Sequence, residues 1–140
     1  MSHETPPGPV PAPPGLRLRR MLKSKIHRIG VTDAELHYPG SITLGAELIE
    51  AADLVPYEEV DVVNVNNGAR FSTYVIVGAP GVCCLNGAAA RLGAVGDLLI
   101  VMAFDLVGEA LVRDWRPRIV HVDERNGLVS VDEAVVPAAR

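Results

Sequence analysis

Short runs of apolar residues separated by turn residues dominate the chain from Met21 onward. Apolar and polar positions alternate over 22–31, which is typical of a strand with one buried face. Six further strand-like segments, bounded mostly by Gly, Pro or Asn, are 59–65, 69–77, 82–85, 98–106, 118–123 and 128–132. Asn67-Gly68 predicts a hairpin and Asn126-Gly127 predicts a turn. About seven short strands in one small domain favour a closed β-barrel.

Helical patterns are few and short. A helix is predicted from about 46 to 54, because Leu48, Ile49 and Ala52 fall on one side of it. A second short helix is predicted near 109–114. The segment 98–106 is continuously apolar, so we expect it to be buried on both faces. The fold class predicted by the pattern is mainly β with short helices.

The chain of 140 residues has room for one domain. Residues 1–20 are rich in proline and end in arginines, so we expect a disordered extension before a folded domain over 21–136. No apolar run approaches the roughly 20 residues of a membrane-spanning helix. The first residues also lack the apolar stretch of a signal peptide. We therefore expect a soluble, cytoplasmic protein without a membrane partner.

The formal net charge of −4 hides an uneven distribution. The range 1–28 holds six of the 13 Lys and Arg residues but only one of the 17 acidic residues. Such an arm is able to attract phosphates, but it lacks interleaved aromatic residues and the acidic remainder would repel a nucleic acid. A solvated tail that leads into a first strand is the preferred interpretation, and no nucleic-acid partner is expected.

Cys83 and Cys84 are the only cysteines, and they are adjacent. Neighbouring strand residues point to opposite faces, so a disulfide between them would need unusual geometry. The four histidines do not have the spacing of a metal site. We expect two reduced structural thiols, while an enzyme that uses one of these thiols as nucleophile lacks an evident histidine partner.

The segment Gly40-Ser41 offers a different chemistry. A serine hydroxyl can attack the preceding carbonyl carbon when the peptide is distorted, and glycine enters such backbone conformations without a Cβ clash. Elimination from the resulting ester cuts the chain and leaves dehydroalanine, which hydrolyses to a pyruvoyl ketone. The competing interpretation is a simple turn, since Pro39-Gly40 is a common turn sequence.

Two further clusters stand at predicted element ends. On a strand, Arg70, Ser72 and Tyr74 face one way, and Phe71 and Thr73 face the other. The second cluster begins at Asn86-Gly87 and predicts a small helix or tight turn. When each cluster is taken alone, a strand with a solvated polar face and a plain turn are the better explanations.

Four motifs taken together resemble one family: Lys25-Ile26-His27-Arg28, Leu36-His37-Tyr38-x-Gly40-Ser41, Asn67-Gly68-x-Arg70-Phe71-Ser72-Thr73-Tyr74 and Asn86-Gly87-Ala88-Ala89-Ala90. They occur in the order and spacing of aspartate 1-decarboxylase, the pyruvoyl-dependent bacterial family that makes β-alanine for pantothenate and coenzyme A. The resemblance extends from about 21 to 136. It implies a double-psi β-barrel, a homotetramer with sites between subunits, and a proenzyme that cuts itself, with or without a maturation factor.

The resemblance also implies roles for individual residues. Ser41 is the pyruvoyl precursor, and cleavage after Gly40 gives a β chain of 1–40 and an α chain of 41–140. Thr73 polarises the Gly40 carbonyl during cleavage and later contacts substrate. Tyr74 donates a proton to the decarboxylated carbon. The residues implied to bind L-aspartate are Lys25, Arg70, Thr73, Asn86, Gly87, Ala88 and Ala89.

The implied reaction is a decarboxylation through a Schiff base on the pyruvoyl group, which acts as the electron acceptor without metal or pyridoxal phosphate. Arg70 is expected to hold mainly the side-chain carboxylate, since its planar fork suits a carboxylate, and this assignment can be exchanged with that of Lys25. The alternative from another class is a β-barrel interaction module that is never cleaved and has no catalytic activity.

Overall fold

In the computed structural model, residues 16–134 are described, and they form strands and three short helices. The strands are β1 Leu18–Gly30, β2 Asp33–Glu35, β3 Ser41–Gly45, β4 Glu59–Asn64, β5 Arg70–Gly78, β6 Cys83–Asn86, β7 Leu98–Gly108, β8 Arg118–Val122 and β9 Leu128–Glu133. The helices are α1 Ala46–Ala51 and the 3₁₀ helices η1 Gly87–Arg91 and η2 Glu109–Asp114. The predicted class, mainly β with short helices, is confirmed.

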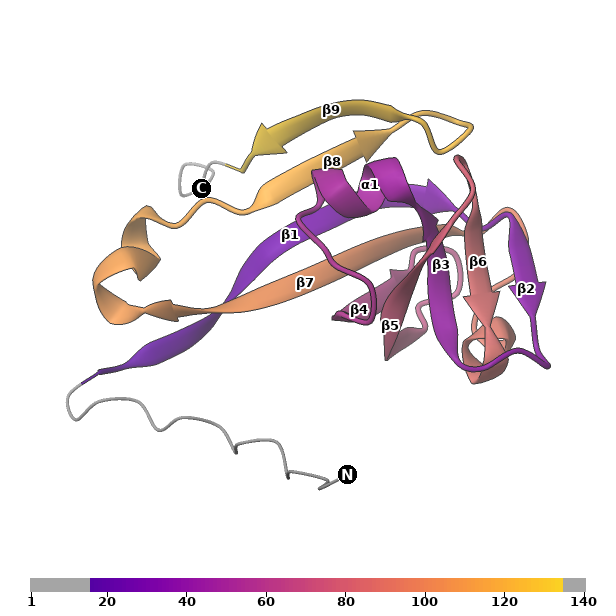
Figure 1. Cartoon of the computed structure of the whole chain (residues 1–140), viewed down its shortest axis with the longest axis horizontal. Coiled ribbons are helices and arrows are strands. Elements are labelled where there is room, and N and C mark those ends of the chain that lie inside the picture. The colour runs from indigo at the N-terminus through magenta and orange to yellow at the C-terminus, as the bar shows by residue number, and fades with distance from the viewer. Residues whose placement is uncertain (1–15, 135–140) are drawn as a thin grey trace, which may run out of the picture.

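The strands pair in the order β2-β6-β3-β5-β4-β7-β1-β8-β9. Figure 1 shows β2, β6 and β3 side by side at one end of the molecule, while the long strands β1 and β7 extend toward the other end. Strand β3 lies between β6, to which it is antiparallel, and β5, to which it is parallel. The start of β3 is therefore flanked by two strands from later in the chain. The double-psi connectivity stays a prediction.

Aliphatic side chains build the core, as the low aromatic content requires. Fully buried members include Ile42 and Leu44 on β3, Val62 on β4, and Val75 on β5. Phe71 packs against this cluster from its edge. Burial of these side chains on the sheet surface is the main favourable term that holds the strands together.

Strand β7 differs from expectation. Leu99, Val101 and Ala103 are buried, but Ile100 and Met102 are only partly covered and Leu106 is 68% exposed. The prediction that both faces are buried was wrong, because no second layer of the described chain covers the other face. The continuous apolar run over 98–106 therefore corresponds to a strand with only one fully buried face.

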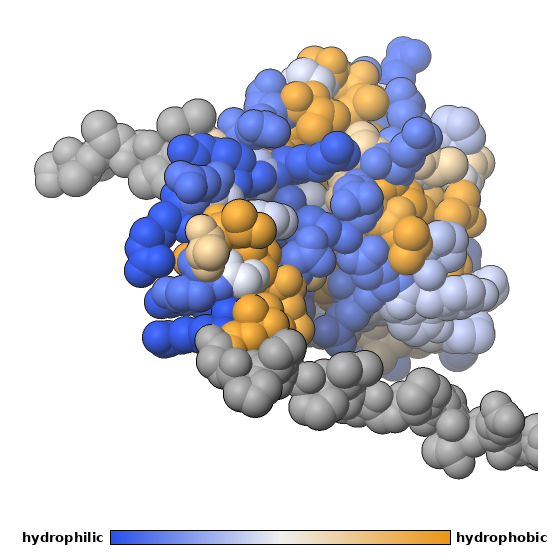
Figure 2. Space-filling model, turned by 60° about the vertical axis from the view of Figure 1, so that its left-hand side comes forward, coloured by the Kyte–Doolittle hydropathy of each residue, from blue (hydrophilic) through white to orange (hydrophobic). Residues whose placement is uncertain are grey.

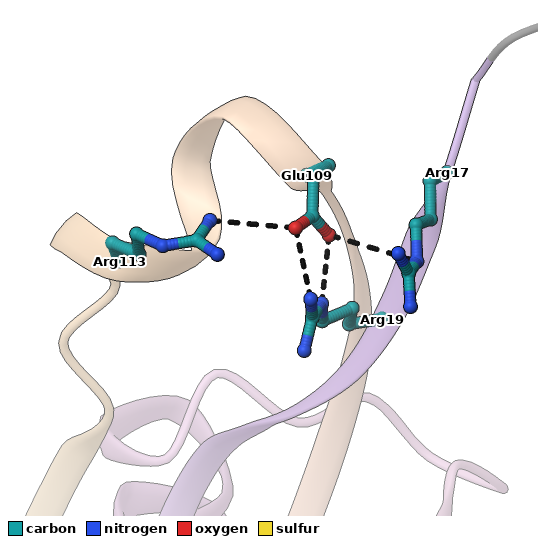
Figure 3. Close-up of polar contacts among 4 residues, drawn as sticks. All are labelled: Arg17, Arg19, Glu109 and Arg113. Atoms are coloured by element: carbon teal, nitrogen blue, oxygen red, sulfur yellow. Dashed lines mark hydrogen bonds and ion pairs between the residues drawn. The ribbon is translucent and has the colours of Figure 1, made fainter.

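Strand β1 begins at Leu18, inside the segment that was expected to be a disordered extension. That boundary was placed too late, because the chain already pairs with β7 from Leu18 opposite Gly108. Side chains reinforce the pairing: the guanidinium of Arg19 donates to both carboxylate oxygens of Glu109, at 2.7 and 2.9 Å. Figure 3 shows Arg17 and Arg113 completing a cluster around this carboxylate. The rest of the predicted extension, 1–15, lies outside the described residues.

A bulge interrupts β1. The register with β7 shifts between Ile26 and Ile29, and Arg28 has a φ of 62°. Three residues apart on a regular strand, Ile26 and Ile29 would point to opposite faces. The bulge lets both of them point into the core. Simple alternation along the sequence could not indicate this change of face.

The remaining predicted elements are found with small differences at their ends. The helix predicted for 46–54 ends at Ala51, and the hairpin at Asn67-Gly68 joins β4 to β5. Strands β2 and β3 were not predicted as strands, because β2 is short and polar and β3 directly follows a turn. No helix between residues 16 and 134 has the length and apolar character needed to cross a membrane.

Candidate active site around Ser41

Ser41 is the first residue of β3, directly after the turn that contains Gly40. Its side chain is 1% exposed, and it pairs across the sheet with Asn86 at the end of β6. The Oγ atom donates to the carbonyl oxygen of Pro39 at 3.3 Å and accepts from Asn86 Nδ2 at 2.9 Å. The fold thus buries this hydroxyl and gives it two polar partners next to the Gly40–Ser41 peptide.

Asn86 is the centre of a buried hydrogen-bond network. Its Nδ2 donates to Thr43 Oγ1 as well as to Ser41 Oγ, each at 2.9 Å. Its Oδ1 accepts from the Cys84 thiol, with Sγ at 3.2 Å. A buried amide needs such partners because an unpaired polar group away from water is costly. The network fixes a donor against residue 41.

Gly87 brings η1 into contact with the turn that contains Tyr38 and Gly40. It has a φ of 65°, and a Cβ added there would lie 2.8 Å from Gly40 Cα, Gly40 N and the Tyr38 carbonyl oxygen. By contrast, a Cβ added to Gly40 would meet nothing within 4 Å, and Gly40 is not in the left-handed region. The sequence argument assigned the special backbone to Gly40, whereas the structure places the close approach at Gly87.

A pocket of about 470 Å³ opens beside Ser41. Tyr74 from β5 contributes one wall, and the turn residues Tyr38 and Pro39 contribute another. Tyr57 also lines it, with its ring centroid 6.0 Å from that of Tyr74. Sequence reasoning did not single out Tyr57; an aromatic residue after Pro56 in a chain with few aromatics was the available signal. A small molecule in this pocket would meet residue 41 and the Tyr74 phenol together.

Thr73 is on β5, the strand that pairs in parallel with β3. In the parallel pair of β3 and β5, Ile42 is opposite Val75. Thr73 is two residues before Val75 on β5, on the side of this pair from which the Gly40 turn enters β3, and it pairs with Val60 of β4 on the other side. In η1, Ala88 is exposed and Ala89 is buried.

None of the seven predicted substrate-binding residues lines this pocket: Asn86 contacts Ser41 from beside it, whereas Lys25 is on β1 and Arg70 is at the start of β5. Arg70 is at the start of β5, about 13 Å along the strand from Tyr74. It lines a separate pocket of about 200 Å³ with Asp61 and Ser72. Lys25 is on β1, opposite Met102 of β7, and is absent from the lining of the Ser41 pocket. A single copy of the described chain therefore does not gather all the predicted groups.

The thiols are poor nucleophiles here. Burial raises the pKa of Cys83 to about 12. Burial, together with the negative charges of Asp33 and Glu35, raises the pKa of Cys84. A thiolate is the reactive form, so these shifts disfavour the thiol-enzyme interpretation. Over residues 16–134, no three His, Cys, Asp or Glu side chains are grouped as a metal site would require.

Comparison with known proteins identifies the family. A family model described as aspartate decarboxylase matches residues 17–129. The aspartate 1-decarboxylase of Pelotomaculum thermopropionicum is 57% identical over 113 residues, which cover 79% of this chain and 86% of the relative. That of Sulfurihydrogenibium sp. is 48% identical over 120 residues, covering 84% and 90%. That of Syntrophus aciditrophicus is 56% identical over 110 residues, covering 77% and 95%. Because these matches extend over most of the chain, the protein belongs to the aspartate decarboxylase family of enzymes.

Proposed function

We propose that this protein removes the α-carboxylate of L-aspartate, giving β-alanine and CO₂, at a pyruvoyl group made from its own Ser41. The β-alanine would supply pantothenate synthesis. The observation that carries the proposal is the buried Ser41 hydroxyl, held by Asn86 Nδ2 in a pocket that also presents Tyr74. Family membership supports the substrate and the overall reaction.

Self-cleavage would begin with attack of Ser41 Oγ on the Gly40 carbonyl carbon. The new C–O bond forms as the C–N bond breaks, which leaves an ester and a free amine on residue 41. Loss of the Cα proton and of the Gly40 carboxylate then gives dehydroalanine, and water releases ammonia to leave the ketone. The attack replaces the present hydrogen bond from Ser41 Oγ to the Pro39 carbonyl oxygen. Thr73, two residues before the Val75 that pairs with Ile42, is the proposed donor to the carbonyl under attack.

The surroundings of residue 41 suit a pyruvoyl group. A buried carbonyl needs a hydrogen-bond donor, and Asn86 Nδ2 already faces this position. When formed, the group would supply a ketone that captures the substrate amine and accepts the electrons left by the departing carboxylate. Tyr74 would then deliver a proton to the former α-carbon, since its side chain lines the same pocket.

Lys25 and Arg70 would bind the substrate carboxylates from neighbouring copies of the chain in a homotetramer. Within one copy they lie apart from the Ser41 pocket. The surface of a single copy also carries exposed apolar side chains on β1, β7, η2 and β9, among them Leu18, Leu106, Leu111 and Val129. Figure 2 shows apolar patches between hydrophilic side chains on one face. Such patches are typical of association surfaces.

The denatured mass spectrum of the purified protein tests the proposal. We expect two fragments split after Gly40, with the larger one lighter by one ammonia than a chain that starts with serine. The Ser41→Ala variant should remain one full-length chain. Borohydride reduction in the presence of aspartate should add the reduced substrate to residue 41 of the wild type alone. A single uncut mass after prolonged warming, with no aspartate turnover, would instead support the interaction module.

A further inference from the structure

A chain of hydrogen bonds connects Cys84, through Asn86, to Ser41. Cys84 Sγ lies 3.2 Å from Asn86 Oδ1, and Asn86 Nδ2 lies 2.9 Å from Ser41 Oγ. Cys84 and Asn86 are two apart on β6, so they point to the same face of the strand. Both are buried, with Cys84 at 7% exposure and Asn86 at 3%.

The two ends of an asparagine amide have nearly the same shape, so only the partners decide which end faces which group. Ser41 Oγ accepts from Nδ2 while its own proton goes to the Pro39 carbonyl oxygen, but a rotated hydroxyl of Ser41 or Thr43 can donate to Oδ1 instead. The Cys84 thiol favours one orientation: its S–H donates to Oδ1, and although this donor is weak, the sulfur is also only a weak acceptor and would be a poor partner for Nδ2. Burial and nearby acids raise the pKa of Cys84, so the thiol keeps its proton near neutral pH.

We propose that Cys84 is a positioning residue for self-cleavage, whose thiol turns the Asn86 amide so that Nδ2 faces Ser41 Oγ. This inference rests on the proposed self-cleavage. In the orientation seen, Nδ2 stabilises the negative charge that develops on Oγ as the hydroxyl loses its proton. In the reversed orientation, Oδ1 would oppose that charge and would hold the hydroxyl proton away from the peptide.

The test is the half-time of cleavage at Gly40–Ser41, followed by mass spectrometry on freshly purified full-length proenzyme. Cys84→Ala and the similarly sized Cys84→Val both remove the donor, and we expect cleavage about 3- to 10-fold slower in each. Cys84→Ser keeps a donor and should cleave near the wild-type rate. Cys83→Ala is the matched control, because it truncates an adjacent thiol that is also buried but has no hydrogen bond to Asn86 among the described residues.

A double-mutant cycle separates positioning from stability. Once Asn86→Ala has removed the amide, adding Cys84→Ala should slow cleavage no further, while the melting temperature should still fall. Equal slowing by Cys83→Ala and Cys84→Ala would overturn the positioning role, as would an unchanged rate in both Cys84→Ala and Cys84→Val. Slow cleavage in Cys84→Ser would also contradict it. A wild-type chain that never cuts would overturn the proposed function itself, whereas normal cutting in every cysteine variant would overturn only this inference.

Discussion

Gly87 shows how one missing side chain controls the geometry of another segment. Its α-carbon faces the backbone of Gly40 and Tyr38 so closely that a methyl group would lie 2.8 Å from three main-chain atoms. Backbone atoms cannot move aside as the end of a flexible side chain does. The contact therefore sets how the turn before Ser41, where cleavage is proposed, packs against η1.

Gly87→Ala should slow self-cleavage strongly, because the turn must shift to admit the methyl group. The positive φ also costs an alanine about 1–2 kcal/mol. Gly68→Ala is the matched control, since Gly68 has a φ of 76° but open space around it. Cleavage half-times and unfolding midpoints of both variants should be measured. If Gly87→Ala and Gly68→Ala have similar stability and similar cleavage half-times, the steric role of Gly87 is contradicted.

Tyr74→Phe should leave cleavage intact and reduce aspartate turnover. A positioned proton donor typically contributes about 10²–10⁴-fold, so a loss in that range is expected. Steady-state kcat on fully cleaved protein is the measurement. Tyr57→Phe, which removes the neighbouring phenol in the same pocket, is the comparison. Equal losses in both variants, or near-normal turnover in Tyr74→Phe, would contradict a specific role for Tyr74.

Among the elements, the start of β1 depends on a carboxylate from a distant helix. Glu109 at the start of η2 accepts two hydrogen bonds from Arg19, and Arg17 and Arg113 lie within ion-pair distance. The Arg19 hydrogen bond is the main cause that lowers the pKa of Glu109 to about 2. The cluster joins the start of β1 to the residue that follows β7, at one end of the ladder that these two strands form.

Glu109→Gln should lower the melting temperature modestly at neutral pH, because exposed ion pairs contribute little each. The folded-state pKa is depressed, so the contribution is complete above about 4.5, the ordinary value, and is lost as pH falls through about 2. The wild-type and variant melting curves should therefore converge between these pH values and also at high salt. Glu124→Gln, at an exposed carboxylate outside the cluster, provides the comparison. A difference that does not change with pH would contradict the assignment.

Much of the element order could be predicted from the sequence, because apolar alternation and Asn-Gly turns are local signals. The bulge at Arg28 could not be predicted, since it depends on register with β7, and neither could the early start of β1, which depends on Glu109 about 90 residues away. For the site, the motifs indicated Ser41, Tyr74 and Asn86. The role of Gly87 against Gly40 and the contact of Cys84 with Asn86 needed the three-dimensional pairing of β3 with β6.

At the scale of the whole molecule, the predicted site is divided. The Ser41 pocket holds residue 41 and Tyr74, while Lys25 and Arg70 lie elsewhere on the same copy. Exposed apolar side chains on several elements provide surface for association with further copies. This arrangement supports a site that is complete only between copies.

Co-expression of Lys25→Ala and Ser41→Ala chains should restore aspartate turnover that neither variant has alone. The Lys25→Ala chain supplies a cleaved residue 41, and the Ser41→Ala chain supplies an intact Lys25. Turnover of the purified mixed assembly is the measurement, and a chain that carries both changes, expressed alone, is the control. A mixed assembly no more active than the separate variants would contradict a shared site.

The place of the cut within the sheet has a consequence for folding. Strands β1 and β2 both precede Gly40, yet β1 is hydrogen-bonded between β7 and β8, and β2 is paired with β6. Cleavage would turn a one-chain folding problem into the association of two peptides that must meet in solution. The unfolding midpoint of the cut protein should then rise with protein concentration, while that of Ser41→Ala should show no contribution from fragment association. Before the cut, the connection at Gly40–Ser41 keeps the two parts of the chain at a high effective concentration. After it, the native state would be maintained by the kinetic barrier to dissociation of the two fragments.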